Sequence, residues 1–225
     1  MASPRSLNGS VVALVGASGG LGRALDAALT SRGATLVRIN RSGNGALGPI
    51  DAIADVRSPD AGSAIVDTAM ERAGRLDGVI VAAGVVAFGD VADTDDVVVE
   101  ELMLTNSMAP LWVANRTHEQ LAATNGFFVN VSGMIADTPM PGMAAYAASK
   151  AAAAAALTAL RKEWRRARID VLDARPPHTE TGLATRPLAG TSPKMPTGLD
   201  PSAVAERIVA GIEARETELT PSDFS

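Results

Sequence analysis

Cysteine is absent from the sequence, which excludes disulfide bonds and thiolate metal sites. Aromatic residues make up only 3% of a chain that is 47% hydrophobic, so its core must consist mainly of Ala, Val, Leu and Ile. The N-terminal stretch MASPRSLNGS lacks the apolar segment of a signal peptide, and no run of about eighteen strongly apolar residues occurs. These absences predict a soluble, cytoplasmic protein without a membrane partner.

Positive charge is also scarce. The chain has 20 Lys and Arg residues against 25 Asp and Glu residues, which gives a formal net charge of −5. Its one dense basic stretch, RKEWRRAR at 161–168, ends a predicted helix, where cations complement the carbonyl end of the helix dipole. Since nucleic-acid-binding domains present a basic surface, we expect no nucleic-acid partner.

The sequence does contain a regular alternation of apolar strands and helical segments. Strands are predicted at 11–15, 35–40, 50–55, 78–83, 126–132 and 169–175, with a short one near Thr217, and helices at 20–31, 59–74, 95–123, 143–167 and 201–214. The third helix is expected to bend near Pro110. Such alternation indicates a parallel sheet with helices on both faces. Without internal repeats or linkers, residues 1–225 should form one doubly wound α/β domain, with 183–200 as a loop or lid.

A glycine-rich turn, VGASGGLGRAL, joins the first strand to the first helix. It places Gly16, Gly20 and Gly22 where bare backbone can approach a pyrophosphate and where the amides at the helix start can bind it. The spacing Gly-x-x-x-Gly-x-Gly differs from the commonest dinucleotide fingerprint, and a glycine-rich loop can also simply turn the chain. Its position directly after an apolar strand favours dinucleotide binding.

The only tyrosine of the chain lies in AAYAASK, within an alanine-rich helix. Tyr146 and Lys150 are one helical turn apart, so their side chains share a face. A free phenol has a pKa of about 10, and a nearby ammonium group is expected to lower that pKa towards neutrality. Tyr146 could then donate a proton to a carbonyl oxygen and accept it in the reverse reaction. The alternative is an ordinary Tyr–Lys pair on the protein surface.

Four motifs occur in a fixed order: the glycine turn, LTNSMAP (104–110), YAASK (146–150) and RPPHTETG (175–182). Together they resemble the short-chain dehydrogenase/reductase family, and the resemblance covers about residues 10–220. It implies a single-domain Rossmann-type sheet. It also implies hydride transfer between a nicotinamide cofactor and an alcohol or carbonyl carbon.

The resemblance implies catalytic roles for four residues. Tyr146 is the expected acid and base, Lys150 also binds the cofactor ribose, and Asn106 holds a water molecule in the proton relay. The family places a serine thirteen residues before the tyrosine to hydrogen-bond the reacting oxygen, and that position is Gly133 here, preceded by Ser132. Neighbouring strand residues point to opposite faces, but a bulge or relaxed strand end would bring Ser132 into the site, and we predict this role for it.

The end of the second strand bears on the choice of dinucleotide. Where NAD-specific members of the family carry Asp, this chain has Asn40, followed by Arg41 and Ser42. An acidic residue would bind the ribose 2′-hydroxyl and repel a 2′-phosphate, whereas a guanidinium and a hydroxyl suit the phosphate. NADP(H) is therefore predicted in preference to NAD(H).

The resemblance extends the predicted cofactor site further along the chain. Asp55 and Val56 match the family's adenine-contacting pair, and Thr181 matches the threonine near the nicotinamide amide. Two departures from the family are VAAG at 81–84, where an asparagine brace is replaced, and Pro177 in place of glycine. The complete predicted cofactor set is Gly16, Ser18, Gly20, Leu21, Gly22, Asn40, Arg41, Ser42, Asp55, Val56, Ala83, Gly84, Tyr146, Lys150, Pro176, Thr179 and Thr181.

The segment 183–200 is expected to select the substrate. It is rich in small and apolar residues, with Arg186 and Lys194 as its basic residues, and so suits an uncharged carbonyl or alcohol compound or an acyl thioester. The resemblance also implies a homodimer or homotetramer. Three functions stay open: an NADP(H)-dependent carbonyl reductase or alcohol dehydrogenase, a 3-ketoacyl thioester reductase, and a non-catalytic dinucleotide-binding sensor or scaffold, which Gly133 keeps in consideration.

Overall fold

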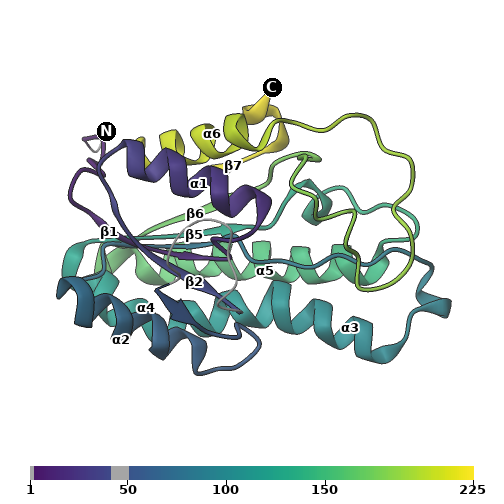
Figure 1. The fold of residues 1–225 in the computed structure, drawn as a ribbon, viewed down its shortest axis with the longest axis horizontal. Coiled ribbons are helices and arrows are strands. Elements are labelled where there is room, and N and C mark those ends of the chain that lie inside the picture. Colours follow the sequence, from purple (N-terminus) through teal and green to yellow (C-terminus); the bar gives the residue numbers. More distant parts are fainter. Residues whose placement is uncertain (1–2, 42–50) are drawn as a thin grey trace.

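The computed structural model describes residues 3–41 and 51–225, in which seven strands form one parallel sheet (Figure 1). The strand order is β3-β2-β1-β4-β5-β6-β7, so the sheet extends from β1 in one direction and from β4 in the other. The strands are β1 (Val11–Val15), β2 (Thr35–Asn40), β3 (Ala52–Ile53), β4 (Gly78–Val81), β5 (Phe127–Val131), β6 (Asp170–Ala174) and β7 (Glu218–Leu219).

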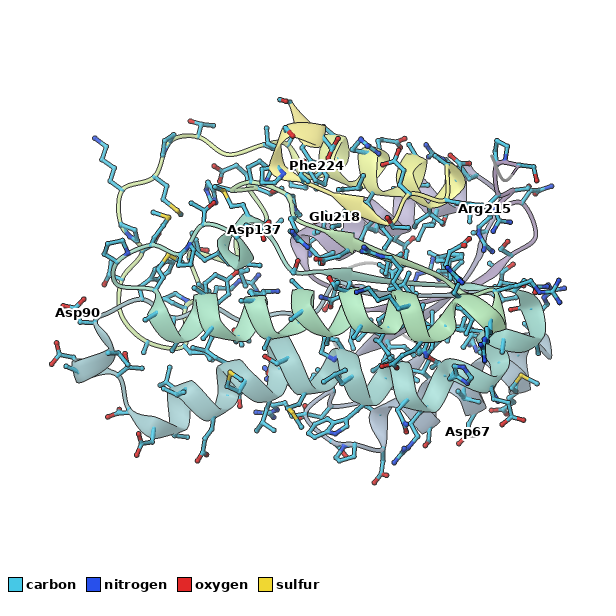
Figure 2. All side chains as sticks on the ribbon, turned by 180° about the vertical axis from the view of Figure 1, so that it is seen from behind. Asp67, Asp90, Asp137, Arg215, Glu218 and Phe224 are labelled. Carbon is cyan, nitrogen blue, oxygen red and sulfur yellow. The ribbon has the colours of Figure 1, made fainter. Side chains whose placement is uncertain are left out.

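Helices cover both faces of the sheet. The helices are α1 (Gly20–Ser31), α2 (Ala61–Ala73), α3 (Asp96–Met103), α4 (Ala109–Thr124), α5 (Ala144–Glu163) and α6 (Pro201–Glu213). The pair α1 and α6 lies on one face, and α2, α4 and α5 lie on the other (Figure 1). Seen from behind, α5 runs across its face with α3 and α4 beside it (Figure 2). The predicted doubly wound α/β fold is confirmed.

Two apolar cores, one on each side of the sheet, hold these layers together. All five residues of β1 are buried, as its sequence VVALV predicts for a strand covered on both faces. Helix α1 buries Leu21, Leu25 and Leu29 at helical spacing in one core. Successive residues of β5 serve the two cores, since Phe127 belongs to the first and Phe128 to the second. Small aliphatic side chains fill most of the remaining space.

The predicted long helix over 95–123 is interrupted. Helix α3 ends at Met103, a π-helical turn spans Leu104–Met108, and α4 then begins. Pro110 lies in the first turn of α4, directly after the π-turn, and the backbone stays in the right-handed helical region from Met103 through Ala109. The expected bend near Pro110 stays a prediction. The π-turn inserts one extra residue per turn, a distortion that is common at functional sites.

The carboxyl ends of the strands meet at one edge of the sheet, where the loops that follow β1, β2, β4, β5 and β6 come together. The strand order reverses between β1 and β4, and ligands of open α/β sheets bind at such a point. Segment 183–200 runs over this edge without a helix or a regular strand, as predicted. Within the described ranges, no helix is both long and apolar enough to cross a membrane.

Candidate active site

A cleft of about 520 Å³ lies at this edge of the sheet. Most of the residues predicted to bind a cofactor line it, and they come from segments far apart in the sequence. They are Gly16, Ser18, Gly20, Leu21, Asn40, Arg41, Asp55, Val56, Ala83, Gly84, Tyr146, Lys150, Pro176, Thr179 and Thr181. Ser42 lies outside the described residues. The contact of each residue with a nucleotide stays a prediction.

The glycine turn is packed too tightly for side chains. Gly16 has a φ of +86°, and a Cβ there would lie 2.7 Å from the backbone nitrogen of Ala83. A Cβ on Gly20 would lie 2.4 Å from the carbonyl oxygen of Thr181. Gly22 does not line the cleft; a Cβ there would lie 2.1 Å from the carbonyl oxygen of Gly16. Gly22 therefore packs α1 closely on the turn, and its predicted contact with a cofactor stays a prediction.

At the end of β2, Asn40 faces the cleft with an unused donor. Its Oδ1 accepts a hydrogen bond from the backbone N–H of Ser18 at 2.9 Å, and the residue is only 4% exposed. Its Nδ2 has no partner among the described residues, and neither has the buried hydroxyl of Thr105, which also lines the cleft. Buried polar groups in proteins are almost always satisfied. A polar ligand such as a nucleotide fits the two unsatisfied groups.

The predicted adenine-contacting residue Asp55 is held by a neighbour that the sequence did not single out. Arg57 donates from Nε to Asp55 at 2.9 Å and from its terminal nitrogen to Glu101 at 2.8 Å. The hydrogen bonds from Arg57 lower the pKa of Asp55 against the effect of burial. A charged Arg57 thus lines the end of the cleft beyond β2 together with Arg41. Only its spacing of two residues from Asp55 could have indicated this pair.

Tyr146 and Lys150 line the cleft from the first turns of α5, as the sequence predicts. Lys150 is 6% exposed, and its Nζ donates to the carbonyl oxygen of Val131, at the end of β5, at 2.9 Å. No hydrogen bond joins Lys150 to Tyr146 in the described part of the chain. The two side chains share a helix face and a cleft, but each has its own environment.

The predicted effect of Lys150 on Tyr146 is wrong for the ligand-free protein. Burial raises the pKa of Tyr146 to about 12, because the phenolate would lose hydration. Burial also lowers the pKa of Lys150 to about 8, and the carboxylate of Asp173 opposes that shift. Tyr146 therefore carries its proton at neutral pH, and the charge of Lys150 is balanced by Asp173 rather than by a phenolate.

Asn106 lies in the π-turn and is 2% exposed. Its Oδ1 accepts from the N–H of Val85, and its Nδ2 donates to the carbonyl of Val85 and to the hydroxyl of Ser149. Asn106 itself does not line the cleft, although a Cβ on Gly84 would lie 3.2 Å from Lys150 Nζ and 3.3 Å from Asn106 Oδ1. Asn106 thus braces the wall beside Lys150, and its role in a proton relay stays a prediction.

The hydroxyl of Ser132 is engaged by another residue in the ligand-free protein, and its predicted role toward the substrate oxygen stays a prediction. This residue borders the cleft, but it is 1% exposed and its Oγ donates to Asp173 Oδ1 at 2.6 Å. Gly133 follows with φ +84° and ψ 160°, a backbone conformation that is essentially restricted to glycine. A Cβ at this position would have only the carbonyl oxygen of Pro176, at 3.9 Å, as a neighbour. The place of the family's serine side chain is therefore open space.

Segment 183–200 covers the cleft from one side. Leu188 N–H donates to the carbonyl of Val86 at 2.8 Å, and Phe88 N–H donates to the carbonyl of Ala189 at 3.0 Å. At its other end, Leu199 forms a parallel bridge with Thr179. These contacts tie residues 188–189 to the loop after β4 and Leu199 to the loop after β6, and the role of the segment as a lid stays a prediction.

Methionine side chains contribute to the wall of the cleft, a feature that the sequence did not single out. Met134, Met140, Met143 and Met195 all line the cleft, and they are four of the eight methionines in the chain. Methionine is flexible and polarizable, which suits irregular apolar ligands. Across residues 3–41 and 51–225, no group of three or more His, Asp or Glu residues is arranged to hold a metal ion.

Comparisons with known proteins agree with this geometry. A family model described as short chain dehydrogenase matches residues 10–189. Versicolorin reductase stcU of Emericella nidulans is 31% identical over 158 residues, which cover 65% of this chain and 60% of that protein, less than two thirds of its length. Ketoacyl reductase HetN of Nostoc sp. is 26% identical over 227 aligned positions, covering 95% of this chain and 79% of that protein.

Two solved structures share the fold. One, an alcohol dehydrogenase from the archaeon Thermococcus sibiricus complexed with 5-hydroxy-NADP, has a TM-score of 0.80 and 20% identity over 94% of each chain. The other is a 3-ketoacyl-(acyl-carrier-protein) reductase from Brucella melitensis complexed with NADH. It has a TM-score of 0.83 and 20% identity over 96% of this chain and 97% of that chain. At such identities the likeness concerns the fold alone.

Proposed function

The chain belongs to the short-chain dehydrogenase family, and we propose that it is an NADP(H)-dependent oxidoreductase that interconverts a carbonyl group and an alcohol. One observation carries this proposal: Tyr146 and Lys150 line the same cleft as the glycine turn between β1 and α1. A proton donor and a dinucleotide-binding turn thus share one space, as hydride transfer to a carbonyl requires.

Residues of the chain would hold the cofactor along the whole cleft. Gly16 and Gly20 would bring the turn close to the pyrophosphate, whose charge the start of α1 favours. Asn40 Nδ2 and the hydroxyl of Thr105, both without partners among the described residues, would donate to ribose or phosphate oxygens. Thr181, across from Gly20, would lie near the nicotinamide end, as the family pattern implies. A nicotinamide nucleotide supplies the hydride when it is bound.

Tyr146 would give its proton to the carbonyl oxygen of the substrate during reduction. A pKa raised to about 12 keeps the phenol protonated at neutral pH, which suits the reductive direction. Lys150 would bind the ribose from its position on Val131 and place a positive charge beside the oxygen that loses the proton. With Gly133 in place of a serine, Tyr146 would be the principal protein donor to the substrate oxygen.

Preference for NADP(H) is supported by charge. Arg41 and Arg57 both line the end of the cleft beyond β2, and Asn40 replaces the carboxylate that would repel a 2′-phosphate. Asp55 and Glu101 both pair with Arg57, so Arg41 is the guanidinium on which this preference depends. The substrate is proposed to be an apolar carbonyl or alcohol compound, since methionines and the side chains of Phe88, Ile135 and Leu183 surround the space beside Tyr146.

A second candidate, a 3-ketoacyl thioester reductase, is favoured by one observation, the match to ketoacyl reductase HetN along most of the chain. A third, a nucleotide-binding protein without turnover, is favoured by the open space at Gly133 and the engaged hydroxyl of Ser132.

We also propose a cytoplasmic homodimer or homotetramer. Exposed apolar side chains along α3, the π-turn and α4, namely Val97, Met108 and Leu111, support self-association.

The test is a deuterium-transfer experiment. The purified protein is incubated with NADPH deuterated at the transferable position and with a panel of apolar ketones, aldehydes, quinones and 3-ketoacyl thioesters, and the products are analysed by mass spectrometry. The proposal expects deuterium on the carbinol carbon of at least one ketone or aldehyde product. Transfer to thioesters alone would favour the second candidate. Tight NADPH binding without transfer to any compound would favour the third.

A further inference from the structure

We propose that Asp173 is a positioning residue of this active site, which holds the end of β5 through Ser132 and thereby fixes both the place and the charge of the Lys150 ammonium group. Asp173 does not contact the cleft, so it would act through other residues. The inference rests on the proposed function for its catalytic consequence. Its structural part can be tested without turnover.

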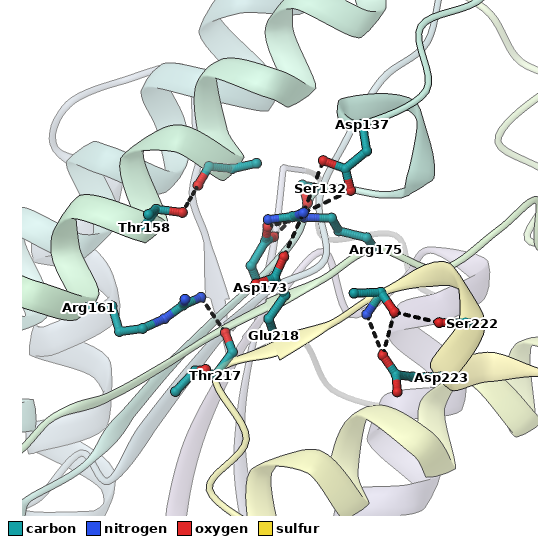
Figure 3. Close-up of polar contacts among 12 residues, drawn as sticks. Ser132, Asp137, Thr158, Arg161, Asp173, Arg175, Thr217, Glu218, Ser222 and Asp223 are labelled. Carbon is teal, nitrogen blue, oxygen red and sulfur yellow. Dashed lines mark hydrogen bonds and ion pairs between the residues drawn. The ribbon is translucent and has the colours of Figure 1, made fainter.

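The first link is a buried hydrogen-bonded chain at the ends of β5 and β6 (Figure 3). Asp173, 0% exposed, accepts from Ser132 Oγ at 2.6 Å through one carboxylate oxygen and from Arg175 Nε at 2.7 Å through the other. Arg175 in turn pairs with Asp137 at 2.8 Å and Glu218 at 2.7 Å (Figure 3). The chain thus connects the buried strand ends with two carboxylates near the surface.

The second link joins this chain to Lys150. Ser132 directly follows Val131, whose carbonyl oxygen accepts the hydrogen bond from Lys150 Nζ at 2.9 Å. The side chain of Ser132 is fixed by Asp173, and its backbone N–H donates to the carbonyl of Ala174 at 3.0 Å. Two anchors on β6 therefore hold the peptide group that positions the ammonium.

The third link is electrostatic. Lys150 is 6% exposed, and the carboxylate of Asp173 is the charge that favours its protonated form. The other groups around Lys150 are neutral at neutral pH: Tyr146 on its own helix and the Asn106 amide from the π-turn. Asp173 also pairs with Arg175, which in turn pairs with the carboxylates of Asp137 and Glu218.

A contribution to folding stability does not by itself explain why these charged residues cluster here. A buried ion pair rarely stabilises a protein more than apolar residues of similar volume would, because both charges must be dehydrated. Here one guanidinium, Arg175, faces three carboxylates, so the cluster keeps an excess of negative charge. Lys150 on the far side of Asp173 lies in the field of that excess. The cluster therefore favours a charged amine inside the cleft wall.

The structural part of the proposal can be tested by NMR titration of the lysine side chains. The chain has three, Lys150, Lys162 and Lys194, and the last two are exposed. Isotopically labelled lysine therefore gives three side-chain resonances, and the signal lost in Lys150→Arg identifies the active-site one. Asp173→Asn keeps an oxygen that can accept from Ser132 but removes the charge, and should lower the pKa of Lys150 by about one unit or more. Arg175→Gln removes the opposing charge and should raise it.

The opposite signs of the two shifts are the signature that a merely structural role would not produce. Lys162 and Lys194 should keep their titration in every variant, and circular dichroism verifies the fold. Glu218→Gln, at the outer end of the cluster, serves as the matched control and should move the Lys150 titration by less than either variant. If Asp173→Asn does not fold, the upward shift in Arg175→Gln still decides. Shifts of the same sign, or none, would overturn the proposal.

The catalytic part uses binding and rate together. Ser132→Ala leaves the charge of Asp173 in place but frees the strand end, so NADPH affinity should fall about two- to tenfold, as for one lost hydrogen bond. Asp173→Asn should move the alkaline limb of the rate profile to lower pH by the shift measured for Lys150. If the pKa of Lys150 shifts with the expected signs but the wild type shows no turnover, the positioning role is supported and the proposed enzymatic function is overturned. An active enzyme whose profile does not move would overturn the positioning role alone.

Discussion

Lys150 Nζ donates to the carbonyl oxygen of Val131 at 2.9 Å, across the junction between α5 and the end of β5. The ammonium group is thus fixed on the sheet, one helical turn from Tyr146, before any ligand arrives. Because its charge is balanced by Asp173, it does not acidify the phenol of the free protein, whose pKa burial raises to about 12. The ligand-free protein is therefore set up as a proton donor, which fits reduction.

The buried amine predicts an unusual pH dependence of stability. The pKa of Lys150 is about 8 in the folded protein and 10.5 in the unfolded chain. Below pH 8 both states are charged and folding carries the cost of burying that charge. Between pH 8 and 10.5 the folded state releases its proton while the unfolded chain keeps it, so the free energy of unfolding should gain about 3 kcal/mol from this group. Urea denaturation of wild type and Lys150→Met across this range measures the difference.

The expected result is that Lys150→Met is more stable than the wild type near neutral pH and that this advantage shrinks as the pH approaches 10.5. Lys162→Met, a substitution at an exposed lysine, is the matched control and should follow the wild type. A constant difference between Lys150→Met and the wild type would contradict a depressed pKa.

Gly20→Ala should weaken nucleotide binding. The new Cβ would lie 2.4 Å from the carbonyl oxygen of Thr181, so the loop after β6 must move. Overpacking of this kind costs about 1–3 kcal/mol, which corresponds to a loss of NADPH affinity of roughly ten- to a hundredfold if the turn holds the cofactor. Gly19→Ala is the control from the same turn, since its Cβ would meet its nearest neighbour, the Gly16 carbonyl oxygen, at 3.3 Å. Fluorescence titration with NADPH compares the two, and equal effects would argue against the proposed contact between the turn and the loop.

Arg41→Asp should reverse the preference between nucleotides. A hydrogen bond to a charged group contributes about 1.5–3 kcal/mol, so the ratio of NADPH to NADH affinity should fall roughly tenfold or more. The introduced carboxylate would repel the 2′-phosphate and accept from the 2′-hydroxyl of NADH. Isothermal titration with both nucleotides measures the ratio, with Arg165→Asp at an exposed position just after α5 as the control for a change of net charge. An unchanged ratio would mean that Arg41 is an ordinary solvated charge.

Gly133→Ser, which restores the family's serine, should destabilise the protein. The conformation at φ +84° and ψ 160° costs a residue with a side chain about 1–3 kcal/mol. Gly133→Ala carries the same backbone strain without a hydroxyl, so urea denaturation should give both variants a similar loss. A serine variant much more stable than the alanine variant would show that the end of β5 can rearrange and engage the new hydroxyl.

The sequence predicted β1, α1 and β2 to the residue, because an apolar strand, a glycine turn and a helix with leucines at helical spacing have strong local patterns. It missed the π-turn at Leu104–Met108, since the extra residue leaves no mark in the apolar spacing and depends on the packing of Asn106 against Val85 and Ser149. The expected single long helix over 95–123 failed for that reason.

The candidate site was predictable where motifs determine geometry and unpredictable where partners are distant in sequence. Tyr146 and Lys150 share a helix face by spacing alone, and the structure places both in the cleft. The direction of the Ser132 side chain depends on Asp173, 41 residues later, and the electrostatics of Lys150 depend on the same residue. The strand sequence IDVLDAR shows the carboxylate of Asp173, but no local pattern indicates that it is buried and bonded to Ser132.

Tyr146→Phe is the most direct test of the central claim that Tyr146 delivers the proton while a bound nicotinamide delivers the hydride. Because this is the only tyrosine, the substitution removes every phenol from the chain. Single-turnover oxidation of NADPH with the best carbonyl substrate should slow by roughly a hundredfold or more, as for the loss of a general acid, while NADPH affinity stays unchanged. An undiminished single-turnover rate in Tyr146→Phe would contradict the account.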